Sequence, residues 1–251
     1  MHRFYLPPSK CHNSVLTLSN AEAHHALRVL RLRRGDRAAI LDGAGHEYLC
    51  EATEVTQDTV ALAVRQKNTV PPLPYQVTLL QAIPKGKIME TIVQKATELG
   101  AARIVPLLSE RVVVQLDDGT SAEKVEKWRL NAIEAIKQCG SAWLPEIEPP
   151  MSPKAFLAHE EKFELLLIAS LQSDSSHPRE LFKTFYAEHA RLPKSVCVWV
   201  GPEGDFTPAE MSAAKSAGAL PITLGRLVLR SETAAVYCLS ILNYELQASY
   251  D

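Results

Sequence analysis

Two stretches decide the fold: V-C-V-W-V-G-P-E-G-D-F-T-P-A-E-M at Val196–Met211 and L-P-I-T-L-G-R-L-V-L-R-S-E-T-A-A at Leu220–Ala235. Each begins as a short apolar strand that breaks at a glycine-containing loop and is followed by a helix. Strands that alternate with helices are typical of a mostly parallel sheet. The sequence therefore predicts an α/β fold in this half of the chain.

The first stretch predicts a buried strand at Val196–Val200, a loop at Gly201–Gly204, and then a helix. The helix start is clear because Thr207 can cap it and Glu210 completes a Thr-x-x-Glu capping box. Pro208 between them suits the first helical position. We expect this helix to end near Gly218.

The second stretch predicts a strand at Leu220–Leu224, a loop that runs from Gly225 to Arg230, and a helix that opens around Ser231. A third strand, Leu165–Ala169, opens into Ser170-Leu171-Gln172-Ser173. Ligands of open α/β sheets bind beyond the carboxyl ends of strands, where loops without bulky side chains let the backbone approach them. The alternative is that the glycines only turn the chain or cap helices, and the residues alone leave both interpretations open.

Composition places the chain among ordinary globular proteins: 46% of its 251 residues are apolar and 22% are charged. The N-terminus lacks the apolar core of a signal peptide, and no apolar run approaches membrane-spanning length. We therefore expect a cytoplasmic protein without membrane contact. The five cysteines form no C-x-x-C pair, which suggests neither a disulfide framework nor a metal site.

Positive charge is concentrated near the N-terminus. Residues 1–74 hold nine Lys/Arg and seven Asp/Glu, a net of +2, whereas the rest hold 18 and 22, a net of −4. Five arginines fall within ten residues after a helix expected to begin near Asn20: Arg28, Arg31, Arg33, Arg34 and Arg37. Such a cluster can neutralise several phosphates of RNA. It can equally be a solvated helix end, where arginines favour the helix dipole.

A proline-rich linker divides the chain at Thr69–Pro74. Before it, β-rich segments at Arg37–Leu41, Glu47–Val55 and Thr59–Val64 predict a small β-barrel-like domain. After it, strands at Gln76–Ile83 and Arg103–Leu107 alternate with helices, the longest of them at Ala122–Cys139. We expect two domains, residues 1–72 and residues 73–251.

Several common catalytic motifs are missing. The chain has no G-x-S-x-G, H-E-x-x-H or G-x-G-x-x-G pattern, which argues against serine hydrolases, zinc proteases and Rossmann dehydrogenases. Lys85 and Lys87 flank a glycine but lack the spacing of a phosphate-binding P-loop.

Taken together, seven ordered motifs resemble the RsmE-type ribosomal RNA methyltransferases of the SPOUT superfamily over essentially the whole chain. They are H-R-F-Y at residues 2–5, H-x-x-x-V-L-R-L-R-x-G-D at 25–36, P-K-G-K at 84–87, Q-K-A-T-E-L-G at 94–100, S-E-R at 109–111, G-P-E-G-D-F-T-x-x-E at 201–210 and L-G-x-x-x-L-R-S-E-T-A at 224–234.

The resemblance implies a PUA-like RNA-binding β-barrel followed by a SPOUT parallel-sheet domain tied in a trefoil knot. It implies a homodimer that uses S-adenosylmethionine to methylate N3 of a uridine in 16S ribosomal RNA of the small ribosomal subunit. The implied cofactor contacts are Leu171, Gln172, Gly201, Pro202, Glu203, Gly204, Leu224, Gly225, Leu227 and Leu229. The implied RNA contacts are Arg28, Arg31, Arg33, Lys85, Lys87 and Arg111.

Arg230 and Glu232 are the implied catalytic residues, facing the methyl group and the target base. Arg230 lies between an apolar run and a helix start, where a guanidinium needs an anionic partner. An ion pair with Glu203 or Glu232 is the structural alternative to a role in catalysis.

One position departs from the family pattern: Ser141 follows Gly140 where the family commonly carries an arginine. Two alternatives therefore stay open. The first is a SPOUT enzyme that modifies another RNA position, and the second is a non-catalytic RNA-binding assembly factor on the same fold.

Overall fold

The computed structural model describes residues 1–112, 118–172 and 174–247. The chain divides into two compact units, which are treated separately below. The first consists of Met1–Pro72 together with Ile133–Leu144, and the second of Leu73–Ala132 together with Pro145–Asp251.

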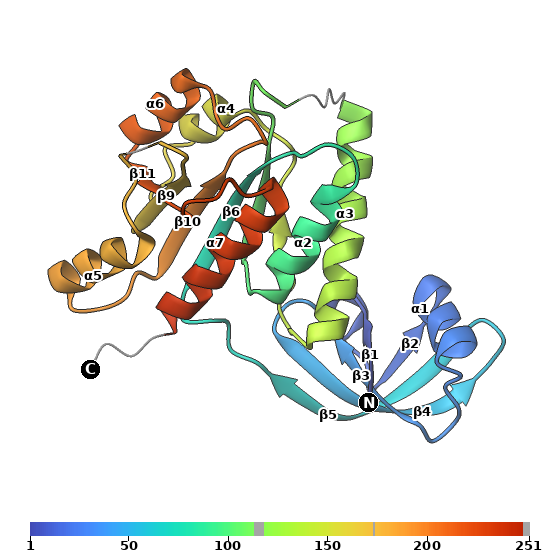
Figure 1. Cartoon of the computed structure of the whole chain (residues 1–251). Coiled ribbons are helices and arrows are strands. Elements are labelled where there is room, and N and C mark those ends of the chain that lie inside the picture. The colour runs from blue at the N-terminus through green and yellow to red at the C-terminus, as the bar shows by residue number, and fades with distance from the viewer. Residues whose placement is uncertain (113–117, 173, 248–251) are drawn as a thin grey trace. The chain divides into compact units, whose positions relative to one another are not determined.

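The first unit is built on a curled five-stranded sheet with the order β1-β3-β4-β5-β2 (Figure 1). Its strands are β1 (His2–Tyr5), β2 (Val15–Leu18), β3 (Arg37–Leu41), β4 (His46–Val55) and β5 (Val60–Thr69). β1 and β3 pair in parallel and the other neighbours pair antiparallel. Two register shifts in the β4–β5 ladder, at Leu49/Cys50 and Ala52/Glu54, bend these long strands around the core. The arrangement confirms the predicted small barrel-like unit, although β5 extends five residues beyond the predicted Val64.

The arginine cluster follows a helix that changes its winding. α1 (Asn20–His24) continues into one π-helical turn, η2 (His25–Val29), and the chain then leaves the helix. Only Arg28 therefore lies on helical backbone, and Arg31 adopts φ +54°. A short 3-10 helix, η1 (Pro8–Lys10), precedes β2.

The last turns of α3 (Asp118–Cys139) belong to the first unit. There Ile133 and Ile136 pack with Tyr5 and Leu41 in a small apolar cluster. Lys137, which is almost fully buried, donates to Glu22 and to Glu134, both at 2.8 Å. Burial disfavours the charged amine, but these two carboxylates raise the pKa of Lys137 above its ordinary value.

The second unit contains a parallel six-stranded sheet with the order β11-β9-β10-β6-β7-β8. Its strands are β6 (Gln76–Ala82), β7 (Arg103–Leu107), β8 (Glu146–Ile147), β9 (Leu165–Ala169), β10 (Ser195–Val200) and β11 (Leu220–Ile222). The apolar runs of β6, β9 and β10 are buried, as expected for strands covered on both faces. The predicted parallel sheet is confirmed.

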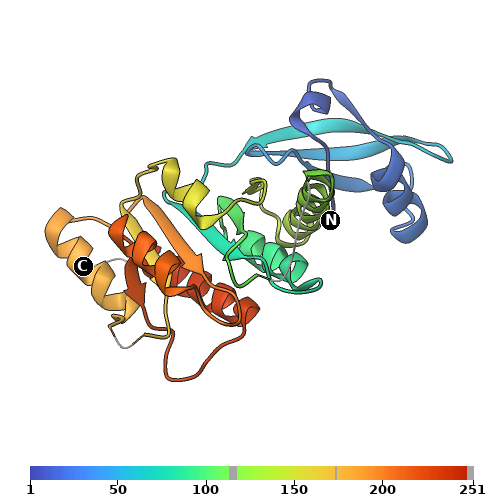
Figure 2. The ribbon, with the colours of Figure 1, turned by 90° about the horizontal axis from the view of Figure 1, so that it is seen from above.

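Helices cover both faces of this sheet (Figures 1 and 2). Besides α3, they are α2 (Ile88–Glu98), α4 (Pro153–Ala158), α5 (Pro178–His189), α6 (Pro208–Ser216) and α7 (Ser231–Leu246). α2 and α7 lie side by side, and α4 and α6 pack over a core centred on Trp199. Among the described residues, no helix is long and apolar enough to cross a membrane.

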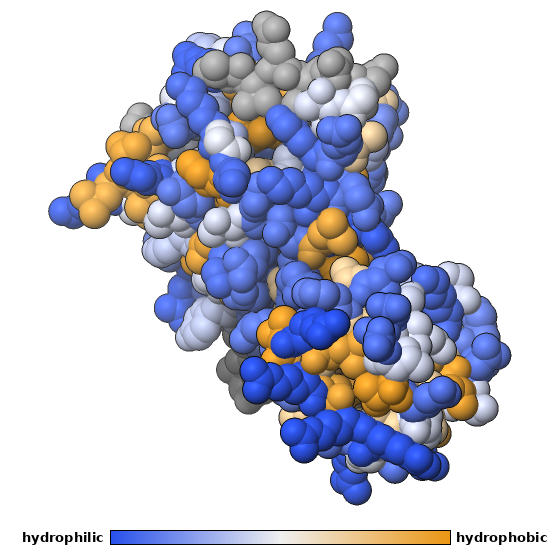
Figure 3. Space-filling view, turned by 90° about the vertical axis from the view of Figure 1, so that its right-hand side faces the viewer, coloured by the Kyte–Doolittle hydropathy of each residue, from blue (hydrophilic) through white to orange (hydrophobic). Residues whose placement is uncertain are grey.

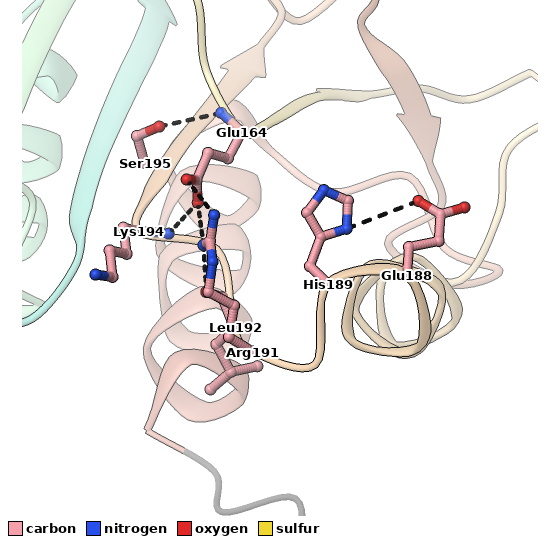
Figure 4. A network of polar contacts seen from close by, with 7 residues as sticks. All are labelled: Glu164, Glu188, His189, Arg191, Leu192, Lys194 and Ser195. Carbon is pink, nitrogen blue, oxygen red and sulfur yellow. Dashed lines mark hydrogen bonds and ion pairs between the residues drawn. The ribbon is translucent and has the colours of Figure 1, made fainter.

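Polar contacts tie together the amino ends of β9 and β10 (Figure 4). The Glu164 carboxylate accepts two hydrogen bonds from the Arg191 guanidinium at 2.8 Å and one from the Lys194 backbone N–H at 2.6 Å. The Ser195 hydroxyl accepts from the Glu164 N–H at 3.0 Å. The Arg191 hydrogen bonds, helped by that of Lys194, lower the pKa of Glu164 to about 2.

The four buried cysteines are core residues. Burial raises the pKa of Cys11 to about 11 and the pKa values of Cys50 and Cys238 to about 12, and it also raises that of Cys197. Such thiols stay protonated and unreactive at neutral pH.

Candidate functional site

A pocket lies in the second unit where β9, β10 and β11 end. Three loops line it, namely the segments that follow β9, β10 and β11, together with the start of α7. Its lining residues are Ala169, Ser170, Leu171, Gln172, Ser175, Val200, Gly201, Pro202, Glu203, Asp205, Thr223, Leu224, Gly225, Arg226, Leu227, Val228, Leu229, Ser231 and Ala234. The site is thus at the carboxyl edge of the sheet, where the glycine-containing loops were predicted to meet a ligand.

The loop after β10 brings bare backbone to the pocket. A Cβ atom at Gly201 would lie 3.3 Å from the Asp205 carboxylate and from the Phe206 ring, so a larger residue fits poorly there. Gly204 does not line the pocket, and a Cβ there would meet only Arg111 Cδ, at 3.7 Å. The two glycines therefore differ: an added Cβ would be tightly packed at Gly201 and would have ordinary van der Waals room at Gly204.

A carboxylate in α6 braces this loop. Glu210 accepts from the Thr207 N–H at 2.9 Å while the Thr207 hydroxyl accepts from the Glu210 N–H, which confirms the predicted capping box. The same carboxylate accepts from the Ser109 hydroxyl at 3.1 Å and from the Glu110 N–H at 2.9 Å. The neighbouring Arg111 donates to the Gly204 carbonyl. The S-E-R segment is therefore part of the support of the loop.

The loop after β11 is the most exposed wall. Gly225 adopts φ +107°, a conformation that side-chain-bearing residues rarely adopt, and its N–H donates to the Thr223 hydroxyl at 3.2 Å. Leu227 and Val228 beyond it are 77% and 74% exposed. Two large apolar side chains left in solvent beside a pocket are surface available to a ligand.

The loop after β9 closes the third side. The Ser170 hydroxyl accepts from the Gln172 N–H at 3.1 Å and fixes the turn. Lys215 of α6 reaches over to Gln172 Oε1 at 3.0 Å and to Asp174 at 2.8 Å. Ser173, which we expected in this loop, lies outside the described residues.

A buried chain of hydrogen bonds runs behind the pocket. Gln81, at the end of β6, donates from Nε2 to the Ser231 hydroxyl at 2.8 Å, and that hydroxyl donates to the Gly201 carbonyl at 3.1 Å. Both side chains are buried. The sequence did not indicate a role for Gln81, because nothing in its apolar strand marks it, nor for the pocket residues Ser175, Thr223 and Ser231.

The predicted catalytic pair borders the pocket but does not line it. Arg230 is exposed and Glu232 is half-buried, directly before and after the lining residue Ser231. In the part of the chain that the structure describes, no ion pair joins Arg230 to Glu203 or Glu232. The expectation of a costly, partly buried guanidinium is therefore wrong, and the bracing ion pair is not formed.

Of the predicted cofactor contacts, all except Gly204 line the pocket. Acidic and basic groups that could meet a polar ligand are Glu203, Asp205 and Arg226. One oxygen of the Asp205 carboxylate already accepts a hydrogen bond from the Phe206 N–H at 2.8 Å. The described residues contain no group of three or more His, Cys, Asp or Glu side chains that could hold a metal ion.

None of the predicted RNA contacts is among the residues that line the pocket. Arg28, Arg31 and Arg33 of the first unit are exposed, and among the described residues no ion pair involves them. Exposed Val29 lies among them, and Figure 3 shows apolar side chains next to strongly hydrophilic ones on this unit. Lys85 and Lys87 are exposed at the end of β6. Arg111 also contacts the Gly204 loop, as described above.

At the departure from the family pattern, another guanidinium is present. Arg3 of β1 donates to the Gln138 carbonyl at 3.4 Å, and its Nη2 atom lies 2.8 Å from where a Cβ of Gly140 would be. The Ser141 hydroxyl is used locally, accepting from the Trp143 N–H at 3.1 Å.

Comparison with known families gives two matches. Residues 71–243 match a family described as the RNA methyltransferase domain, and residues 18–64 match one described as the RNA methyltransferase PUA domain. Ribosomal RNA small subunit methyltransferase E of Bacillus subtilis is 33% identical and aligns with 92% of this chain and 90% of its own. The Synechocystis protein of that name is 32% identical, over 98% of this chain and 78% of its own.

Solved structures are similar over nearly the whole chain. A putative methyltransferase from Legionella pneumophila, in complex with the cofactor SAM, superposes with a TM-score of 0.86 and 33% identity, over 96% of each chain. Ribosomal RNA small subunit methyltransferase E from Neisseria gonorrhoeae, bound to S-adenosyl methionine, gives a TM-score of 0.84 at 27% identity, over 97% of each chain.

Proposed function

Because the chain belongs to the ribosomal RNA small subunit methyltransferase E family, we propose that it methylates small-subunit ribosomal RNA with S-adenosylmethionine as the methyl donor. The observation that carries the proposal is the pocket at the ends of β9, β10 and β11, formed by loops whose backbone is open to a ligand. Its place at the carboxyl edge of a parallel sheet is where such folds bind nucleotides.

The pocket residues fit a nucleoside-like cofactor. Apolar side chains of Leu171, Leu227 and Leu229 can cover an adenine ring, and the backbone of the three loops offers donors and acceptors for its edges. At Gly201 the loop after β10 presents backbone without a side chain to the pocket, and an added Cβ would press on Asp205 and Phe206. When bound, S-adenosylmethionine supplies an electrophilic methyl group on a sulfonium.

The finer part of the proposal is that the methyl acceptor is N3 of a uridine in 16S ribosomal RNA. This nitrogen carries a proton between two carbonyl groups, so its attack needs loss of that proton and stabilisation of the charge left on the ring. The Arg230 guanidinium has no ion-pair partner among the described residues and borders the pocket, which suits it to hold that charge. We propose that Glu232, which follows the lining residue Ser231 in α7, helps to orient the base.

The arginine cluster supports RNA as the substrate. Exposed guanidinium groups without acidic partners are free to contact phosphates. We propose that the PUA-like RNA-binding domain (residues 1–72), which makes up most of the first unit, provides this grip through Arg28, Arg31 and Arg33. We propose that Lys85, Lys87 and Arg111 of the methyltransferase domain (residues 73–251) add further contacts to the RNA.

We further propose that the protein is a homodimer with a trefoil-knotted methyltransferase domain. The exposed aromatic side chains of Tyr237 and Tyr244 on α7 support an association surface on this helix. Light scattering coupled to size-exclusion chromatography tests the dimer, because a mass of one chain would contradict it.

The decisive experiment is methylation of small-subunit RNA that lacks the modification, followed by mapping of the product nucleoside by mass spectrometry. We expect methyl transfer from labelled S-adenosylmethionine to one uridine, with the methyl on N3. Methylation of a ribose or of another base atom would favour the alternative raised by Ser141 in place of the family arginine. Absence of any S-adenosylmethionine binding in calorimetry would favour the non-catalytic assembly factor.

A further inference from the structure

Gln81 of β6 is buried, does not line the pocket, and yet contacts two parts of the pocket wall through one hydroxyl. Its place in the sheet is next to Val200, which is the last residue of β10 before the glycine loop. Gln81 can therefore influence that loop although it does not line the pocket.

The orientation of the Gln81 amide is fixed by its neighbours. Its Nε2 atom donates to the Ala82 carbonyl at 2.9 Å and to the Ser231 hydroxyl at 2.8 Å, so both of its N–H groups are used. A rotated amide would place oxygen against the Ala82 carbonyl, which can only accept. The remaining Oε1 atom is buried and has no hydrogen-bond partner among the described residues.

This orientation sets the direction of the Ser231 hydroxyl. Because Ser231 Oγ accepts from Gln81, its own proton points to the Gly201 carbonyl, 3.1 Å away. These two hydrogen bonds join the end of β6, the start of α7 and the loop after β10. The three segments are far apart in the sequence. Ser231 and Gly201 both line the pocket, so the chain fixes two of its walls relative to each other.

An amide that leaves its oxygen unpaired in the core is costly, and an apolar side chain of the same size would avoid that cost. We propose that Gln81 is a positioning residue for the cofactor: through Ser231 it holds the Gly201 carbonyl and the α7 start in the arrangement that binds S-adenosylmethionine. The inference rests on the proposed function, because it concerns affinity for that cofactor.

The test compares Gln81→Met, which fills a similar volume without donating, with Ser231→Ala and with the double variant. We expect each single variant to raise the calorimetric Kd for S-adenosylmethionine about tenfold, equivalent to about 1.4 kcal/mol. Gln81→Met should have no further effect in the Ser231→Ala background, because either change breaks the same chain. In turnover by Gln81→Met, KM for the cofactor should rise while kcat stays within a few-fold of the parent.

Thr97→Val is the matched control. Thr97 is buried in α2 and donates to the Val93 carbonyl at 2.8 Å, so the variant also loses one buried hydrogen bond, but at a residue that does not line the pocket. It should lower the melting temperature without changing the Kd.

Three results would overturn the inference: parent-like affinity in Gln81→Met, an equal loss of affinity in Thr97→Val, or additive effects in the double variant. A parent protein that binds no S-adenosylmethionine would instead overturn the proposed function itself, so the two failures are distinguishable.

Discussion

At the scale of single residues, the two glycines of the loop after β10 differ in the room around them. A valine at position 201 would press on the Asp205 carboxylate and the Phe206 ring, which start 3.3 Å from the first added atom. We expect Gly201→Val to weaken S-adenosylmethionine binding at least tenfold in calorimetry, since the pocket wall must shift. Gly204→Ala, where the nearest atom is 3.7 Å away, is the control and should bind normally. Equal affinities in both variants would remove Gly201 from the cofactor contacts.

Arg230 carries the prediction on chemistry. Because it borders the pocket without an ion-pair partner among the described residues, Arg230→Ala should leave folding and cofactor affinity nearly unchanged. Single-turnover methylation should fall by about a hundredfold, the usual cost of removing a donor that faces developing charge. Arg230→Lys should not restore the rate, because an ammonium lacks the planar fork of a guanidinium. Rates within a few-fold of the parent in both variants would show that Arg230 is not catalytic.

At the scale of helices and strands, α6 depends on one carboxylate. Glu210 accepts from Thr207, Ser109 and Glu110, so Glu210→Ala removes the capping box and the anchor of the S-E-R segment together. We expect a loss of about 2 kcal/mol in the free energy of unfolding, measured by urea denaturation. Ser152→Ala, which removes only the single cap of α4, should cost about 1 kcal/mol. A loss at Glu210 no larger than that at Ser152 would mean that the contacts to Ser109 and Glu110 add nothing.

The Glu164–Arg191 pair links β9 and β10 and makes stability depend on pH. The pKa of Glu164 is lowered from 4.5 to about 2, chiefly by the Arg191 hydrogen bonds, so the pair stabilises the fold above pH 4.5 and this contribution is lost as the pH falls toward 2. Glu164→Gln should therefore lower the melting temperature at neutral pH and flatten its fall in acid. Glu51→Gln is the control. The side chains of Glu51 and Arg65 are 40% and 59% exposed, so their ion pair contributes little to the stability of the fold. If the melting temperatures of the parent and of Glu164→Gln fell equally with decreasing pH, the Glu164–Arg191 pair would not be the source of the pH dependence.

Elements with strong local signals were predictable. Arg37–Leu41, Arg103–Leu107 and Leu165–Ala169 are strands with the predicted bounds, and Thr207 begins a helix as its capping box indicated. The short strands β1, β2 and β8 escaped prediction, because two to four residues carry too little periodicity. They exist through pairing with partners that are distant in the sequence.

At the scale of the whole molecule, the arginine cluster predicts how RNA binding responds to salt. Alanine at Arg28, Arg31 and Arg33 together should weaken RNA binding and reduce the slope of log K against log salt by about 2 to 3, because each lost phosphate contact removes close to one unit. Cofactor affinity should stay unchanged, since none of the three lines the pocket. Arg65→Ala, on β5, is the single-charge control. An unaltered slope in the triple variant would assign the cluster to ordinary solvated surface.

The pocket could be predicted in place but not in detail. The loops that contain Leu171, Gly201 and Gly225 were recognisable, because the strands of a parallel sheet bring their carboxyl ends to one edge. The hydrogen bond between Gln81 and Ser231 that supports these loops was not recognisable from the sequence. It joins residues 150 positions apart and depends on the order of the strands. For the same reason the trefoil knot stays a prediction that comes from family resemblance alone.

Residues 133–144 are part of the first unit, and this has a consequence for how the protein is made. Tyr5 and Leu41 find their apolar partners Ile133 and Ile136 only after much of the second unit has been synthesised. Glu22 likewise can accept its hydrogen bond from Lys137 only after residue 137 has been synthesised. Domains generally fold in order from the N-terminus as they leave the ribosome. Here the N-terminal barrel must stay incomplete, with an apolar face uncovered, until about residue 144 has emerged, so a nascent chain stalled before that point should be more sensitive to protease than one stalled after it.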